Sequence, residues 1–289
     1  MRINNFIKLL LFILIPVFSI HAQNEYTIEF NTKTEPIDNG SIKQTEIGMH
    51  FFKNINATNT LTNTFKYKST TITDEIESYL LENYNSNYSD THFNSLTNAF
   101  EFTHQFTEKT KLNLSIEPTM NFQNTLNISD ITVLGGVEIN QQINKNNSID
   151  LGIKRMTVFG KPQILPTFAF NHKFNEEIFL KLGFPNSELS YSNSIRNTFR
   201  INNDFTGSNY NLNPSIITND LSSISKVGFS QIETTLQYER NIDTSWFVNF
   251  KGGYSTNKEF KFSDENKITE INQDLKNGTT FSISIKYKL

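Results

Sequence analysis

The chain ends in the stretch 281-FSISIKYKL-289, in which large apolar side chains alternate with polar or cationic ones. Successive side chains of a β-strand point to opposite faces, so this period of two predicts a strand with one apolar face. That face carries Phe281, Ile283, Ile285, Tyr287 and Leu289. We expect this strand to form the closing seam of a β-barrel, because its long apolar face would otherwise leave an unpaired edge.

The same alternation recurs along most of the chain. It is clearest at residues 26–30, 61–68, 96–106, 111–117, 131–139 and 246–254. Many of these stretches can be traced as strands of about ten residues or more, the length that a tilted strand needs to cross a bilayer. Strands of soluble proteins average about half that length. A soluble sandwich also alternates, but strand length favours an all-β fold, a transmembrane antiparallel up-and-down β-barrel.

Composition limits the classes of function. The 289 residues include 26 Phe and 10 Tyr, the formal net charge is -3, and the mean hydropathy is -0.43. This charge does not suit a surface that tracks nucleic-acid phosphates. The chain has no cysteine, which excludes disulfides, thiolate metal sites, a cysteine nucleophile and a lipidated N-terminal cysteine.

The N-terminal segment predicts export. Arg2 and Lys8 precede an apolar run at residues 9–20, and small or polar residues follow up to Ala22. A charged start, a short apolar run and a small-residue site are typical of a secretory signal, and the run is too short for a transmembrane helix. We therefore predict a signal peptide at residues 1–22, an outer-membrane barrel domain at residues 23–289 and an outer-membrane location.

The connections between the alternating stretches sort by length. The short set lies at residues 54–59, 107–110, 144–147, 175–177, 193–194 and 241–243. The other set holds long connections at residues 72–91, 207–225 and 257–278, with shorter members at 35–41, 123–130, 159–162 and 185–187. Short periplasmic turns and longer outer loops are typical of outer-membrane barrels. This tracing gives about 14 strands, or about 12 if the region near Pro185 is irregular, and places both termini in the periplasm.

Charged residues fall on the polar parity of the strands, where they would face the lumen. The candidate lumen-lining residues are Glu29, Lys66, Glu101, Lys111, Glu117, Glu138, Lys154, Arg196, Arg200, Glu233 and Lys251. Such charges are costly toward lipid and acceptable in a hydrated or salt-bridged interior. They could line an open pore, or they could close it by pairing across the barrel.

One region carries a family resemblance. Residues 163–200 read QILPTFAFNHKFNEEIFLKLGFPNSELSYSNSIRNTFR, with a Leu-Pro at the start of a strand and a Leu-Gly-Phe-Pro before the next. The chain resembles an uncharacterised family of Gram-negative outer-membrane β-barrel proteins, known only as a domain of unknown function. The motif positions are Leu165, Pro166, Gly183, Phe184, Pro185 and Tyr191. The resemblance implies the fold and the location, and it supplies no catalytic residue or substrate.

Motifs that would indicate chemistry are weak. His92, Ser95 and Glu101 lie in one strand region, but His92 and Ser95 differ in parity and match no triad pattern. No histidine pair has the spacing of a zinc helix. Acidic residues at 74–77 and at Glu82 could hold a divalent cation, although a solvated acidic loop is the commoner explanation, because carboxylates alone do not define a coordination geometry. We expect no catalytic, cofactor-binding or metal site.

The sequence thus predicts a non-enzymatic barrel that acts as a channel or as a surface-presenting structural protein. An outer-membrane enzyme with a site at the loop end and a soluble exported binding protein remain alternatives. The expected partners are outer-membrane lipids, the barrel-assembly machinery and small solutes, with no nucleic acid.

Overall fold

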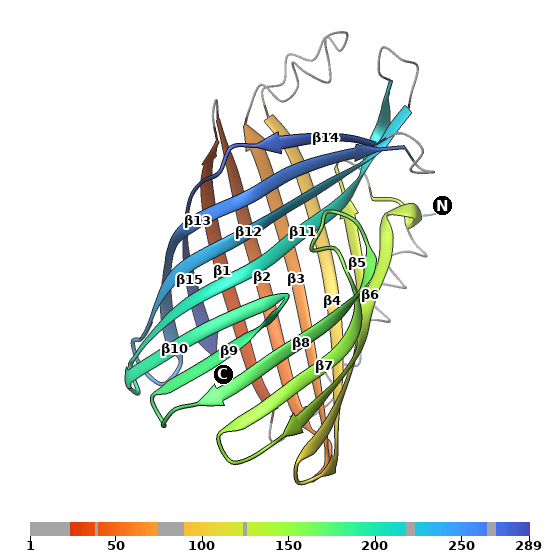
Figure 1. Ribbon diagram of the computed structural model, residues 1–289. Coiled ribbons are helices and arrows are strands. Elements are labelled where there is room, and N and C mark those ends of the chain that lie inside the picture. Colours follow the sequence, from red (N-terminus) through yellow and green to blue (C-terminus); the bar gives the residue numbers. More distant parts are fainter. Residues whose placement is uncertain (1–23, 38–39, 74–89, 124–125, 218–222, 265–269) are drawn as a thin grey trace.

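The computed structural model describes residues 24–37, 40–73, 90–123, 126–217, 223–264 and 270–289. Antiparallel strands account for nearly all of these residues (Figure 1). A short 3₁₀ turn, η2 (Ile128–Asp130), precedes the sixth strand. None of the described residues belongs to a helix long and apolar enough to cross a membrane.

The strands are β1 (Asn24–Ile37), β2 (Gly40–Asn54), β3 (Asn59–Thr73), β4 (Asp90–Thr107), β5 (Thr110–Phe122), β6 (Ile131–Gln142), β7 (Asn147–Met156), β8 (Gln163–Lys173), β9 (Ile178–Phe184), β10 (Asn186–Ser194), β11 (Asn197–Ile217), β12 (Ser223–Asn241), β13 (Trp246–Ser263), β14 (Glu270–Leu275) and β15 (Gly278–Lys288). Neighbours in the chain pair from β1 to β13, and β15 pairs with both β13 and β1. β14 pairs with β13 alone and lies outside this ring. The fold is therefore a closed 14-strand antiparallel up-and-down barrel, which confirms the predicted fold class.

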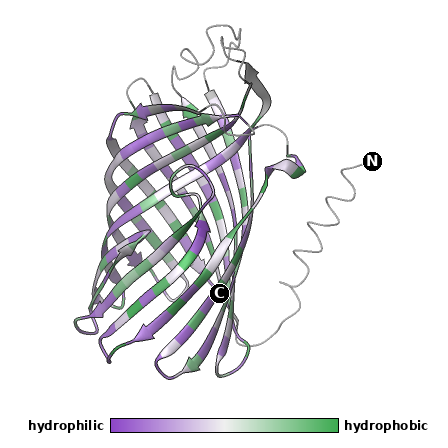
Figure 2. Cartoon of the chain, turned by 45° about the vertical axis from the view of Figure 1, so that its right-hand side comes forward, coloured by the Kyte–Doolittle hydropathy of each residue, from purple (hydrophilic) through white to green (hydrophobic). Residues whose placement is uncertain are grey.

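Hydrophilic and hydrophobic residues alternate along the strands (Figure 2), and this alternation separates the two faces of the wall. Large apolar side chains on the outer face remain exposed, with exposed fractions of 46% for Phe30, 59% for Leu151 and 56% for Phe168. Their sequence neighbours on the other parity are polar and face the interior. This arrangement places apolar side chains toward an apolar surrounding and polar ones toward the lumen.

The turns at one end share a side-chain hydrogen bond. An Asn or Asp oxygen accepts the backbone N–H groups of the residues two and three positions further along, at Asn56, Asn144, Asn175 and Asp243. These side-chain turns explain part of the abundance of Asn, because a short polar side chain can replace a missing backbone partner. The backbone hydrogen bonds from Ser245 and Trp246 hold the pKa of the Asp243 carboxyl below its usual value. Both described chain ends, Asn24 and Leu289, lie at this end, which we call the turn end.

Strands β11, β12 and β13 are longer than expected and run past the ends of β7–β10 (Figure 1). The predicted loop at residues 207–225 is wrong over most of its length, because β11 continues to Ile217 and β12 begins at Ser223. The predicted loop at residues 257–278 is wrong for the same reason, since it contains the end of β13 and all of β14. The third long loop, at residues 72–91, falls mainly on residues 74–89, which lie outside the described residues.

The hairpin tips of the shorter strands end against β11. The backbone N–H of Phe205 donates to the carbonyl of Pro185 at 3.0 Å, and Asn211 pairs with Phe122 at the end of β5. Between these points the β7–β8 tip crosses the outer face of β11 and β12, where a Cβ atom on Gly207 or Gly228 would overlap its backbone. These contacts cover the edge of β11 that β10 leaves unpaired, and an uncovered edge is a site for aggregation.

The two faces exchange character in the extensions of β11–β13. Here the interior side chains are apolar, including Tyr210, Val227 and Phe260, whereas the outer positions carry Lys226 and Lys261. In β13 the change occurs at a bulge beside Asn257, whose φ of 50° lies in the left-handed region. A strand with a polar outer face belongs in water, so this inversion indicates where the wall leaves the apolar surrounding. The sequence did not predict these segments as strands, because the prediction required apolar residues on the outer face.

Candidate functional site

Contacts between strands that are not neighbours identify the interior of the barrel. The Nζ atom of Lys33 on β1 lies 2.5 Å from Oε2 of Glu233 on β12, although β15 and β13 separate these strands in the sheet. Lys68 on β3 reaches the hydroxyl of Ser208 on β11 at 3.3 Å. Side chains that meet across the barrel in this way must point inward.

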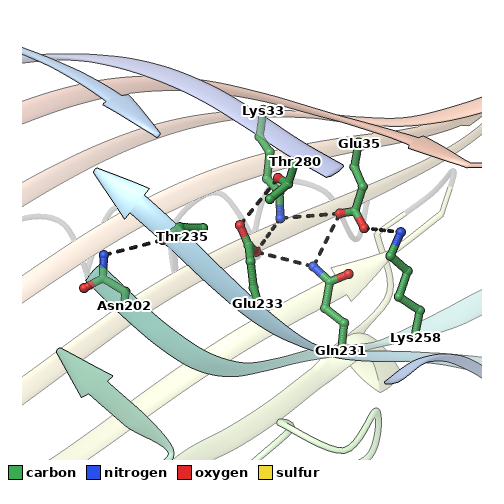
Figure 3. Close-up of polar contacts among 8 residues, drawn as sticks. All are labelled: Lys33, Glu35, Asn202, Gln231, Glu233, Thr235, Lys258 and Thr280. Atoms are coloured by element: carbon green, nitrogen blue, oxygen red, sulfur yellow. Dashed lines mark hydrogen bonds and ion pairs between the residues drawn. The ribbon is translucent and has the colours of Figure 1, made fainter. Parts of the chain in front are cut away.

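Lys33 and Glu233 belong to a buried charged network near the loop end, the end opposite the turn end (Figure 3). Lys258 of β13 lies 2.5 Å from Glu35 of β1, and the exposed fractions of their side chains are 0% and 2%. Lys33 also approaches Glu35 at 3.6 Å. Gln231 donates to Glu35 at 3.5 Å and to Glu233 at 3.4 Å. Two cations thus balance two carboxylates, as a buried ionic cluster requires.

An apolar cluster closes the interior beyond this network, toward the loop end. Its buried members are Ile42, Ile72, Phe93, Tyr210, Leu212, Ile224, Val227, Phe260 and Phe262. Phe93 of β4 stacks on Tyr210 of β11 with ring centroids 4.7 Å apart. The cluster takes its members from β2, β3 and β4 and from β11, β12 and β13, so side chains from several sides of the ring fill the interior. Strands β6–β10 have ended by this level, and β1–β5 with β11–β14 remain. A barrel of about eight strands is just wide enough for side chains to fill it.

The interior nearer the turn end is polar and partly open to water. Lys154 pairs with Glu138 at 3.1 Å, and Lys66 pairs with Glu46 at 3.5 Å. The Lys66 side chain is 48% exposed. Arg200 and Lys286 share Glu239, at 3.4 Å and 3.1 Å. Charged pairs therefore line this part of the interior without filling it.

The strand register places most candidate lumen-lining residues on this interior face. Those on the interior parity are Glu29, Lys66, Glu101, Lys111, Glu117, Glu138, Lys154, Arg200, Glu233 and Lys251. Arg196 instead lies in the exposed turn between β10 and β11. The structure brings Glu138 to Lys154 and Glu233 to Lys33, whereas within the described part of the chain no ion pair joins Glu29, Glu101 or Lys111 to another residue.

The central members of the network were not among the residues predicted from the sequence to line the lumen. Glu35 and Lys258 fell within predicted loops, yet both lie in strands. Lys33 and Glu35 continue the parity of Glu29, so this signal was present in β1. Lys258 follows the bulge in β13, where the parity shifts, and no local pattern identifies such a shift.

The motif residues cluster around the β8–β10 hairpins. Leu165 and Pro166 lie in β8, Gly183 and Phe184 end β9, Pro185 follows a cis peptide bond, and Tyr191 lies in β10. The ring of Phe184 packs against Phe159 and Phe205 with centroids 6.0 Å and 5.1 Å apart. A Cβ atom on Gly183 would overlap the backbone of β8. Phe184 and Pro185 thus join the β7–β8 and β9–β10 tips to β11, whereas Tyr191 lies near the turn end, opposite Ile178.

The weak catalytic candidate does not assemble. His92 faces outward, where its Nδ1 atom lies 3.0 Å from the Thr71 hydroxyl, whereas Ser95 and Glu101 lie on the interior parity. Within the described ranges no group of three or more His, Asp or Glu could hold a metal ion. The acidic residues at 74–77 and Glu82 lie outside those ranges.

Similar solved structures are barrels. The chain aligns with a NanC porin at 6% identity, covering 91% of this chain and 100% of that one, with a TM-score of 0.44. A Pseudomonas aeruginosa FadL homologue matches at 8% identity, 91% and 89% coverage and a TM-score of 0.45. The translocator domain of the autotransporter NalP from Neisseria meningitidis matches at 8% identity, covering 99% of this chain and 95% of that one, with a TM-score of 0.41. The likeness concerns the fold alone.

No curated protein matches the chain. A family model described as "Domain of unknown function (DUF6268)" matches residues 19–288.

Proposed function

Because the chain belongs to the DUF6268 family, whose description assigns no function, we propose a function from the geometry of the interior. The protein is an integral outer-membrane barrel that acts as a channel for small hydrophilic solutes. It stands here in a closed state, with the apolar cluster as the barrier. It is not an enzyme.

The outer surface supports the membrane assignment. Exposed apolar side chains cover the outer face of strands all around the barrel. The face inversion in β11–β13 supplies a boundary beyond which the wall suits water. With the signal peptide at residues 1–22 removed, the turn end and both termini would lie in the periplasm and the loop end outside. Outer-membrane lipids and the assembly machinery are then the partners of the barrel.

The interior supports the channel assignment and carries it. Paired charges of both signs line a water-accessible section, which then meets a section filled by Phe93, Tyr210 and Phe260. A continuous polar interior would conduct, and an apolar constriction blocks ions by excluding water. The barrier consists of side chains from β2–β4 and from β11–β13, so a modest separation of these two groups of strands would open it.

Conductance in planar lipid bilayers tests this function. The mature protein is refolded in detergent, inserted, and compared with a Phe93→Ser/Phe260→Ser variant that makes the barrier smaller and polar. We expect few openings from the unaltered protein and reproducible discrete steps from the variant. Their ion selectivity would report the lumen charges. A Phe168→Ala/Phe250→Ala variant alters two exposed outer aromatics and should behave as the unaltered protein does.

The gel-mobility shift on heating shows whether each variant is folded. If the folded barrier variant stays silent, the channel proposal is wrong. The barrel would then serve as a structural protein that presents its loops at the surface.

A further inference from the structure

A polar cavity lies where β11–β13 leave the membrane section, between their outer face and the tips of the β5–β6 and β7–β8 hairpins. Its volume is about 180 Å³. Lys226 of β12 and Lys261 of β13 line it from one side, and Arg155 of β7 and Lys161 of the β7–β8 tip line it from the other. All four cations come from elements that meet only in the folded barrel.

Hydrogen bonds between β11 and the two tips fix the walls of the cavity. The Asn209 side-chain amide donates to the carbonyl of Gly160 at 3.0 Å. The Asn211 amide donates to the carbonyl of Ser129 at 2.8 Å and to the carboxylate of Asp130 at 2.9 Å. Gly228 allows the β7–β8 tip to lie against β12. The cavity is therefore formed before any ligand arrives, which lowers the entropic cost of binding.

The charge of the lining is unbalanced. Asp130 is the acidic residue among the lining residues, and it is buried and already accepts hydrogen bonds from Asn211 and from the backbone of Asn127. Lys261 lies 2.9 Å from Glu259, whereas Lys226 has no ion pair within the described part of the chain. With Glu259 beside Lys261 included, four cations stand against two carboxylates, and this net positive charge attracts an anion. The Arg155 guanidinium also donates to the carbonyl of Val133 at 2.6 Å. Ammonium and guanidinium groups are strong donors to phosphate oxygens.

We propose that this cavity binds a phosphate group. Its size suits a phosphate with part of an attached sugar, and its polar lining suits the hydroxyl groups of that sugar. Two sources share this chemistry. One is a soluble phosphorylated solute, and the other is the phosphorylated head of a lipid, because the cavity lies just above the face inversion. The site lies on the outer side of the wall, so it does not depend on whether the barrel conducts.

Binding to the refolded full-length mature barrel tests the proposal. Inorganic phosphate is titrated by calorimetry at constant ionic strength, with chloride as the reference anion. In parallel, native mass spectrometry counts lipid A molecules retained by the barrel from nanodiscs that contain lipid A or phosphatidylcholine alone. The test variant is Lys226→Gln/Lys261→Gln. The matched control is Lys109→Gln/Lys145→Gln, which removes the same charge from exposed turns at the turn end.

We expect the test variant to bind about tenfold more weakly than the unaltered barrel, since each lost lysine removes a charge-assisted hydrogen bond. The control should bind normally. Loss with inorganic phosphate supports a soluble ligand, and loss with lipid A alone supports a lipid headgroup. Binding of neither probe by the folded barrel, or equal loss in the test and control variants, would overturn the proposal.

Discussion

Lys258 and Glu35 form the most buried ion pair described in this barrel, with Nζ of Lys258 2.5 Å from Oε1 of Glu35. A charge that is removed from water needs a close partner, because the solvation it loses is worth several kcal/mol. Lys33 lies 3.6 Å from the same carboxylate and offers Glu35 only a second, more distant partner. The pair joins β13 to β1 beyond the point where β15 begins, so it links the two strands where their shared neighbour is absent.

At the residue scale we predict that Lys258→Met lowers the free energy of unfolding by about 3 kcal/mol, because it leaves Glu35 buried without its nearest cation. Lys258→Met/Glu35→Gln should lose less than the single variant. The measurement is urea unfolding in detergent, followed by gel mobility. Lys173→Met breaks an exposed pair with Glu176 and should change stability by less than about 1 kcal/mol. A double variant less stable than Lys258→Met would contradict the unpaired Glu35 carboxylate as the cause of the destabilisation.

At the scale of the element, β15 differs from every other short strand because it closes the ring. Eight of its residues pair with β1 and ten pair with β13. β14, which precedes it, pairs with β13 alone. β15 therefore closes the barrel, whereas β14 only covers an edge of β13.

Deletion of residues 281–289 should abolish assembly, because β1 and β13 would each be left with an unpaired edge in an apolar surrounding. The measurement is the gel-mobility shift on heating after refolding. Replacement of residues 270–275 by a Gly/Ser segment of equal length removes β14 and should leave that shift intact. A normal shift from the truncated chain would contradict the role of β15.

At the scale of the whole molecule, one chain forms two sections of different width. The section of 14 strands has apolar side chains outside and charged pairs inside. The narrower section at the loop end has an apolar interior and a polar outer face, as a soluble barrel does. The face of a strand that contacts lipid is apolar, and the face that contacts water is polar. The exchange of apolar and polar faces in β11–β13 therefore follows from the change from lipid to water.

The absence of cysteine makes this arrangement testable by labelling. A single cysteine at Lys66→Cys should react quickly with a membrane-impermeant maleimide, because the Lys66 side chain is 48% exposed. Phe262→Cys should react only after unfolding, because Phe262 is 5% exposed. Ile195→Cys, at a position 94% exposed in a turn, is the reference for full reactivity. Equal rates at Phe262→Cys and Ile195→Cys would show that the loop end is open.

The sequence by itself determined the barrel, the strand number and the outward face of the membrane section. These properties follow from the period of two and from turn residues such as Asn144 and Asp243, which act over a few neighbouring residues. The parity of Glu138 and Lys154 likewise placed them on the polar face, although their pairing required the register of β6 and β7.

Only the tertiary structure decided how the interior closes. The extensions of β11–β13, the pairing of Glu35 with Lys258 and the phosphate-sized cavity join residues up to 223 positions apart. Such contacts depend on the tilt and stagger of the closed barrel, and no local period encodes them. The extensions were also not predicted as strands, because their apolar side chains face the interior. A prediction that expects apolar residues on the lipid-facing side assigns such segments to loops.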